Sequence, residues 1–187
     1  IMVSQIKVNE IIKQSGSSIT IGESGDTITL PSSATLTNFP DNSPYFVASK
    51  TSSQTLTHTA TTKITFDSVP IESSSGVFDL SNDKFTVVTA GKYNFQINVT
   101  FFDSNNALKR MDGLLYKNGS QHKKFIFYDN GGNIREVPSH YTFFESVSVD
   151  DYFELYSRIE TTDSGTADVV GGGDGQTFFS GYKLIGI

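Results

Sequence analysis

The most regular pattern in the sequence is a strict alternation of apolar and polar residues over positions 92–101. Its polar positions are Lys, Asn, Gln and Thr, and its apolar positions are Tyr93, Phe95, Ile97, Val99 and Phe101. A period of two puts apolar side chains on one face of a β-strand and polar ones on the other. The sequence therefore predicts a long central antiparallel strand with one face in a core, preceded by a turn at Ala90-Gly91.

Shorter segments of the same kind follow one another from residue 44 to the end, separated by Gly, Pro, Asn and Asp, which favour turns. No long helical periodicity occurs after residue 14. We therefore expect an all-β domain over 44–187, and about ten strands fit a two-sheet jelly roll. The expected strands cover 45–49, 54–57, 63–69, 83–88, 92–101, 110–116, 124–128, 140–149, 152–159 and 176–187, with a hairpin turn at Lys117-Asn118-Gly119-Ser120.

The segment 15–43 has a different pattern, in which Ile19 and Ile21 recur nine positions later as Ile28 and Leu30. Such thin strands offer too few apolar side chains to be buried within one chain. We expect a β-repeat stem in which three chains wind together, and a Ser/Gly/Thr linker is the alternative. Residues 1–14 mix Ile and Val with Lys and Glu, which we interpret as an N-terminal docking arm or a frayed terminus.

Composition excludes several classes of function. The chain of 187 residues has a net charge of −6 and contains no cysteine. Nucleic-acid binding is therefore not expected, and disulfides, thiolate metal sites and cysteine nucleophiles are excluded. No apolar run approaches the roughly 20 residues of a membrane span, so membrane insertion is not expected either.

Catalytic and metal-binding residues are also not expected. His58, His122 and His140 are scattered, and no Gly-x-Ser-x-Gly motif or zinc-type spacing occurs. The Gly-rich segment 163–175 carries three aspartates that could supply oxygen ligands to Ca²⁺. No bidentate Glu or calcium-loop signature accompanies them. We therefore expect a mobile loop, no catalytic residue and no cofactor, with calcium as the alternative.

Aromatic residues exceed the needs of one thin sandwich. The adjacent pairs Phe101-Phe102, Phe143-Phe144 and Phe178-Phe179 should point to opposite faces of their strands. One face then fills the core, and the other requires cover from a neighbouring chain. This pattern predicts association with neighbouring copies of the chain through an interface that includes Phe102, Phe144, Phe178 and Tyr182.

A ligand is expected at the loops, because loops on a rigid sandwich usually carry recognition. The segments 103–108, 129–138 and 161–176 are rich in Gly, Asn and Asp. Positive charge concentrates at Lys109, Arg110, Lys117, Lys123 and Lys124. These cations could meet an anionic host-surface glycan, or form a solvated face that protects strand edges. The expected ligand-binding residues are Lys109, Arg110, Asn130, Arg135, Asp168 and Asp174.

The order of motifs resembles the globular head of complement component 1q, within the tumour-necrosis-factor-like jelly rolls. The matching residues are Tyr45-Phe46-Val47-Ala48, Ile64-Thr65-Phe66-Asp67, Phe85-Thr86-Val87 with Ala90-Gly91-Lys92-Tyr93-Asn94-Phe95, Lys117-Asn118-Gly119 and Phe178-Phe179-Ser180-Gly181-Tyr182-Lys183-Leu184. The resemblance implies a trimeric jelly-roll β-sandwich. The chain departs from the family in carrying Asp150-Asp151 in place of Gly-Asp, in lacking tryptophan and in having no collagen repeat.

The segment SITIGESGDTITLPSSATL resembles stems of bacteriophage fibre and decoration proteins. The expected function is a non-enzymatic virion structural protein on the particle surface. It would be a trimeric fibre or capsid decoration protein, bound to other virion proteins through residues 1–43 and displaying a host- or glycan-binding head. The alternative is a secreted or spore-surface bacterial lectin-like adhesin. We favour the virion because the first residues do not form the apolar core of a signal peptide.

Overall fold

The computed structural model describes residues 21–29, 41–172 and 176–185. The chain divides into two compact units, Ile1–Phe39 and Pro40–Ile187. In the first unit, residues 21–29 form turns and coil, and the side chains of Ile21 and Ile28 are exposed. The predicted arm 1–14 and most of the predicted stem 15–43 lie outside the described residues, so both stay predictions.

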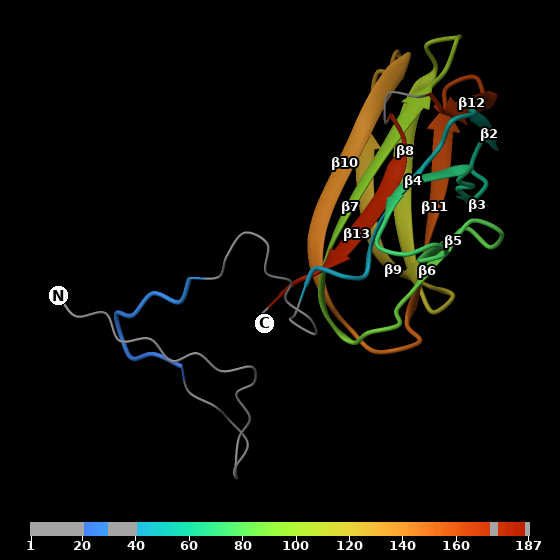
Figure 1. The fold of residues 1–187 in the computed structure, drawn as a ribbon. Coiled ribbons are helices and arrows are strands. Elements are labelled where there is room, and N and C mark those ends of the chain that lie inside the picture. Colours follow the sequence, from blue (N-terminus) through green and yellow to red (C-terminus); the bar gives the residue numbers. More distant parts are fainter. Residues whose placement is uncertain (1–20, 30–40, 173–175, 186–187) are drawn as a thin grey trace. The chain divides into compact units, whose positions relative to one another are not determined.

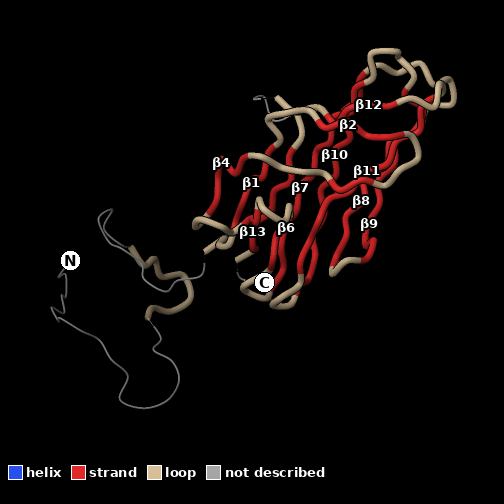
Figure 2. Tube along the Cα trace, turned by 90° about the vertical axis from the view of Figure 1, so that its right-hand side faces the viewer, coloured by secondary structure: helices blue, strands red, loops and turns tan. Residues whose placement is uncertain are grey.

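The second unit is a sandwich of two antiparallel sheets (Figure 1). Its described residues form strands and loops without a helix (Figure 2). Sheet A contains β1 (Tyr45–Ser49), β2 (Gln54–Thr57), β4 (Ser68–Glu72), β7 (Gly91–Phe102), β10 (Glu136–Val147), β12 (Thr166–Val169) and β13 (Phe178–Lys183). Sheet B contains β3 (Thr62–Lys63), β5 (Phe78–Asp79), β6 (Lys84–Thr86), β8 (Leu108–Lys117), β9 (Ser120–Tyr128) and β11 (Tyr152–Thr161).

Strand order places β7 inside sheet A. The order is β2-β12-β7-β13-β1-β4, with β10 on the remaining edge of β7. In sheet B the order is β5-β6-β11-β8-β9, and β3 also pairs with β11. Two antiparallel sheets packed face to face form a jelly roll, which is the architecture that the sequence predicted.

The central strand joins the two sheets through its apolar face. All five alternating apolar residues of β7 are completely buried, which confirms the prediction from their spacing. The Phe95 ring centroid lies 4.8 Å from that of Phe153 on β11 and 5.4 Å from that of Phe143 on β10. Phe95 therefore packs against both sheets at the middle of one aromatic core.

Several local predictions are confirmed by the backbone. Strands β1 and β2 have the predicted bounds. Asn118 and Gly119 join β8 to β9 with φ values of 54° and 76°. Positive φ at both positions is the requirement of a type I′ turn, which explains the Asn-Gly pair in the predicted hairpin.

The predicted strand over 63–69 is wrong as a single element. β3 ends at Lys63 in sheet B, and β4 begins at Ser68 in sheet A. Between them Ile64 and Phe66 are buried in the core, and the Phe66 N–H donates to Asp83 Oδ1 at 2.7 Å. The alternating pattern reflects a chain that crosses between the sheets while its apolar side chains fill the space between them.

The predicted mobile loop over 163–175 is also partly wrong, because Thr166–Val169 forms β12. Ala167 and Val169 are buried, and Ala167 lies opposite Leu56 of β2. Elsewhere the errors are at boundaries: β10 begins at Glu136 rather than 140, and the last strand covers only Phe178–Lys183. The short strand β5 was not predicted.

The Asp150-Asp151 turn explains one departure from the family pattern. Asp150 has a φ of 70°, in the left-handed region that favours Gly and that Asp tolerates better than most residues. Asp151 accepts hydrogen bonds from the Ser148 N–H at 2.9 Å and Asn118 Nδ2 at 2.8 Å, and Lys117 Nζ lies 2.9 Å away. These contacts tie the β10–β11 turn to the β8–β9 hairpin.

Acid is expected to weaken this connection. Hydrogen bonds from Ser148, Asn118 and Lys117, in that order, lower the pKa of Asp151 from 3.8 to about 2. Because the folded state has the lower pKa, the stabilisation is complete above about pH 4 and is lost as the pH falls towards 2. We expect Asp151→Asn to lower the free energy of unfolding by about 1 to 2 kcal/mol at pH 7, and by much less at pH 2.

Urea denaturation at pH 7 and at pH 2 measures this difference. Asp150→Asn is the matched control, because Asn also tolerates a positive φ and no hydrogen bond of the Asp150 side chain is found among the described residues. An equal loss of unfolding free energy in both variants would contradict the stabilising role of the Asp151 carboxylate. A loss that does not depend on pH would contradict it as well.

Candidate functional site

The outer face of sheet A, turned away from the core, has a polar centre and an aromatic surround. Alternation along β7 places four side chains on this face, and they are Asn94, Gln96, Asn98 and Thr100. Asn98 Nδ2 and Thr100 Oγ1 both donate to the carbonyl oxygen of Gln176. The polar side chains of the alternating strand thus form an ordered stripe across the sheet.

Aromatic side chains lie on both sides of this stripe. Register places Tyr45, Tyr182, Asn94 and Phe144 in one row across β1, β13, β7 and β10. A second row contains Ser49, Phe178, Asn98 and His140. Phe144 is 67% exposed, although its chain neighbour Phe143 is buried in the core.

All four aromatic residues predicted for the subunit interface project from this face. Phe144, Phe178 and Tyr182 belong to the two rows, and Phe102 lies further along, at the end of β7. The structure therefore brings the predicted residues onto one surface. Their contact with a second chain stays a prediction.

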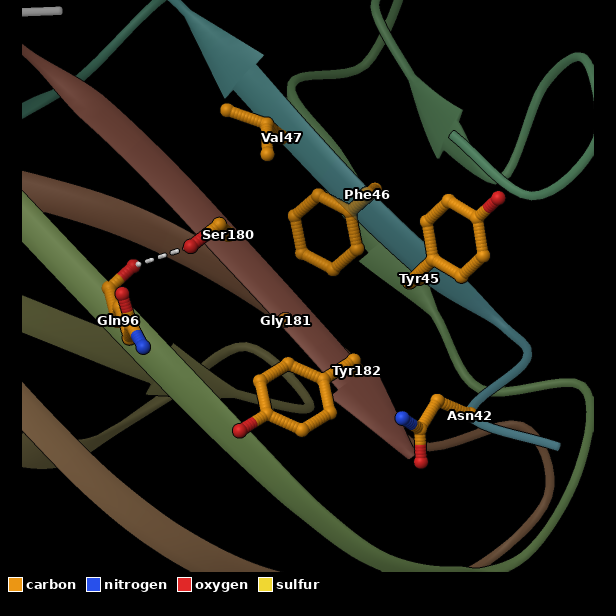
Figure 3. Close-up of a pocket in the computed structure, with 8 residues that line it drawn as sticks. All are labelled: Asn42, Tyr45, Phe46, Val47, Gln96, Ser180, Gly181 and Tyr182. Atoms are coloured by element: carbon orange, nitrogen blue, oxygen red, sulfur yellow. Dashed lines mark hydrogen bonds between the residues drawn. The ribbon is translucent and has the colours of Figure 1, made fainter. Parts of the chain in front are cut away.

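A hollow of about 460 Å³ lies on this face between β1 and β13 (Figure 3). Its lining residues are Asn42, Tyr45, Phe46, Val47, Gln96, Ser180, Gly181 and Tyr182. Gly181 allows close packing beneath it, because a Cβ there would lie 2.7 Å from the Phe95 ring. The hollow gives the face a concave region in which a side chain of another molecule could be buried.

A second group of exposed apolar side chains lies on β9, at the free edge of sheet B. β9 ends sheet B and β10 ends sheet A, so among the described strands neither has a partner on its outer side. Ile126 is 52% exposed and Tyr128 is 53% exposed, with Phe127 between them. Exposed apolar side chains on a long unpaired strand are unusual in a monomer, because they promote association.

Three loops gather at one end of the sandwich, which we call the tip. The Asp103 N–H donates to the Arg135 carbonyl at 2.7 Å, and the Thr162 N–H donates to the Ala107 carbonyl at 2.9 Å. These bonds connect the β7–β8, β9–β10 and β11–β12 loops (Figure 1). The start of β1 lies at the opposite end, which we call the base, because Tyr45 pairs with Tyr182 near the end of β13.

The predicted ligand-binding residues separate into groups. Arg135 and Asp168 lie at the tip, and Arg135 is placed 5.4 Å from the Phe102 ring centroid. Lys109 and Asn130 lie nearby, where the Asp129 N–H donates to the Lys109 carbonyl and the Tyr128 hydroxyl donates to Asn130. Asp174 lies outside the described residues.

Arg110 projects from the outer face of sheet B, away from Asp168. It donates through Nε to Asp112 Oδ1 at 2.8 Å, and this hydrogen bond raises the pKa of Arg110. Asp112 is completely buried, with Lys124 Nζ 2.9 Å and Arg158 3.8 Å from its other oxygen. The sequence pattern does not predict the burial of Asp112, because a lone Asp within a strand gives no sign of it.

The predicted cations are mostly paired within the chain. Lys117 pairs with Asp151, Lys123 with Glu145, and both Arg110 and Lys124 with Asp112. Burial opposes the ionised form of Glu145, but hydrogen bonds from His122 and Lys123 outweigh it and lower the Glu145 pKa. These pairs favour the alternative in which the cations form a solvated face.

The three histidines have separate partners. His58 Nδ1 accepts the Thr161 N–H at 3.0 Å, His122 pairs with Glu145, and His140 lies 3.0 Å from Thr142 Oγ1. Within 21–29, 41–172 and 176–185, no group of three or more His, Asp or Glu side chains could hold a metal ion. The same residues include no helix able to span a membrane.

Sequence comparison finds no matching family model and no matching curated protein. The structure is similar to the globular domain of zebrafish complement 1qA, with a TM-score of 0.52 and 11% identity over 75% of this chain and 97% of that one. It is also similar to murine APRIL, with a TM-score of 0.55 and 13% identity over 75% and 98%. The protein therefore has a jelly-roll fold of the complement-1q and tumour-necrosis-factor type.

Proposed function

We propose that the protein is a non-enzymatic virion structural protein of a bacteriophage, a homotrimeric fibre or capsid decoration protein. Residues 1–43 would anchor it to the particle, and the jelly-roll head would be displayed on the virion surface. The observation that carries the proposal is the exposed outer face of sheet A, with its aromatic rows and hollow.

Two different apolar surfaces support a ring of three chains. A closed cyclic assembly larger than a dimer joins one surface of each subunit to a different surface of the next. The outer face of sheet A is one such surface, and the β9–β10 edge is another. Complement-1q-like and tumour-necrosis-factor-like domains, which share this fold, are typically trimeric.

The positions of base and tip support anchoring at one end and recognition at the other. Residues 41–45 join the head at the base, where the Lys183 N–H donates to the carbonyl of Asn42. The three connected loops lie at the tip, some ten residues further along β7. An N-terminal anchor would thus leave the tip loops farthest from the attachment point of the head.

Particle attachment tests the proposed role. Phage particles that lack the protein are incubated with the full chain or with residues 40–187, and bound protein is measured after sedimentation. We expect the full chain to bind and 40–187 to stay folded and trimeric but unbound, because residues 1–39, which make up most of the anchor, have been removed. Equal binding by 40–187 would contradict the anchoring role. Isolation of the protein from spores or culture medium, without particles, would favour the adhesin.

A further inference from the structure

A polar hollow of about 370 Å³ lies at the tip, where the outer face of sheet A meets two loops. Its lining residues are Thr55, Phe102, Asp103, Ser104, Asn105, Gly165, Thr166, Ala167 and Asp168. The volume falls within the roughly 300–1,000 Å³ of small-molecule sites. Register places Thr55, Asp168 and Phe102 in one row across β2, β12 and β7, so their side chains share this face.

The walls of the hollow are fixed by hydrogen bonds. Buried Asp103 accepts the N–H groups of Asn105 at 2.8 Å and Ala107 at 3.2 Å, which sets the β7–β8 loop. Asn105 Nδ2 donates to Asp163 Oδ2 at 3.2 Å and joins that loop to the β11–β12 loop. A site whose loops are already ordered loses less conformational entropy on binding.

Three side chains in or beside the hollow have groups that are available to contact another molecule. Asp168 Oδ1 accepts the Thr55 hydroxyl at 2.7 Å, and its other oxygen has no hydrogen bond from the described residues. The half-buried ring of Phe102 forms an apolar wall. Phe102 lies at the end of β7, beyond the two aromatic rows, so here its ring is assigned to the ligand and the subunit interface to the rows alone. Exposed Arg135 stacks on this ring and takes part in no salt bridge within the described chain.

We propose that this hollow binds one sugar unit of a saccharide. The C–H face of the sugar ring packs against Phe102, and vicinal hydroxyls donate to Asp168. Hydroxyl and amide groups of Ser104 and Asn105 bond the remaining hydroxyls, and Arg135 meets a carboxylate where the sugar carries one. An aromatic ring beside a carboxylate matches a saccharide, because the ligand presents an apolar ring face and a rim of hydroxyl donors.

This inference rests on the proposed recognition role of the head and names its ligand class. Binding of the full chain is measured on an array of neutral and uronic-acid-containing oligosaccharides. The oligosaccharide that binds most tightly is then titrated in solution to measure its dissociation constant. We expect Asp168→Asn to weaken binding by about 10-fold or more, because a charge-assisted acceptor is lost. Phe102→Leu should weaken binding similarly, because it removes the flat ring and keeps most of the apolar volume.

Two controls isolate the hollow. Asp79→Asn makes the same change of charge at the end of β5, in sheet B, and is expected to leave the dissociation constant unchanged. Arg135→Gln should weaken the binding of uronic-acid-containing oligosaccharides and leave the binding of neutral ones unchanged. This variant therefore distinguishes an acidic sugar from a neutral one as the ligand. Thermal unfolding and solution mass are measured for every variant, because a folded trimer is needed for comparison.

Three outcomes are informative. Weaker oligosaccharide binding by Asp168→Asn and Phe102→Leu, with unchanged binding by Asp79→Asn, supports the hollow as the saccharide site. Saccharide binding that both variants retain would overturn the hollow as the site, while leaving glycan recognition by the head intact. A folded trimer that binds particles but no oligosaccharide on the array would overturn the inference and leave the proposed virion role standing.

Discussion

Replacing Tyr182 with glutamate is expected to convert the proposed trimer into monomers without unfolding the head. Tyr182 is only partly buried in the single chain, and it lies between Tyr45 and Asn94 in the middle of the aromatic row. In a trimer built on this face, the new carboxylate would be desolvated without a partner. An unpaired buried charge costs several kcal/mol, so the dissociation constant should rise by more than about 100-fold.

Light scattering over a series of protein concentrations measures this effect. Tyr152→Glu is the matched control, because Tyr152 is also partly buried but projects from the outer face of sheet B, near Lys84. We expect this control to stay trimeric. A Tyr182→Glu protein that remains trimeric, or a control that dissociates equally, would contradict the assignment of the interface to sheet A.

The largest loss of stability within one chain is expected from Phe95→Ala. The Phe95 ring is completely buried, and its centroid lies within 6 Å of five other aromatic rings from both sheets, namely Phe85, Tyr93, Phe143, Phe153 and Phe179. Truncation removes its buried apolar surface and leaves a cavity that a rigid sandwich closes only partly. The expected loss is about 3–5 kcal/mol in the free energy of unfolding.

This measurement is best made in the Tyr182→Glu background, because association would otherwise add to the apparent stability. Phe144→Ala is the control, since Phe144 is 67% exposed and lies opposite Asn94 on the outer face. We expect Phe144→Ala to change the free energy of unfolding of the monomer by no more than about 0.5 kcal/mol. In the otherwise unaltered chain, the same control should weaken association. Comparable losses for both phenylalanines would contradict the division between core and outer face.

The sequence predicts the faces of the strands better than their ends. A strand has a fixed period of two, so the alternation in β7 and the aromatic pair at Phe143-Phe144 determine which side chains enter the core. The Asn118-Gly119 turn is equally local, because only a few residue pairs accept positive φ at both positions. These features need no knowledge of which strands are neighbours.

Features that depend on neighbours could not be predicted in this way. Ile64 and Phe66 alternate like a strand, but they lie in a crossover between the sheets. β12 is short and lies in a segment rich in Gly and Asp, so only its pairing with β2 and β7 makes it a strand. Asp112 and the gathering of loops at the tip follow from topology, and a linear pattern does not contain the topology.

We propose that the head forms a trimer through the outer face of sheet A. The most direct test is the solution mass of the full chain and of residues 40–187, measured by light scattering at micromolar concentration. We expect three times the chain mass of 20.4 kDa for the full protein and three chain masses for the shorter one. A monomer in both cases would contradict the claim. A trimer only when residues 1–39 are present would place assembly in the stem and not in the jelly roll.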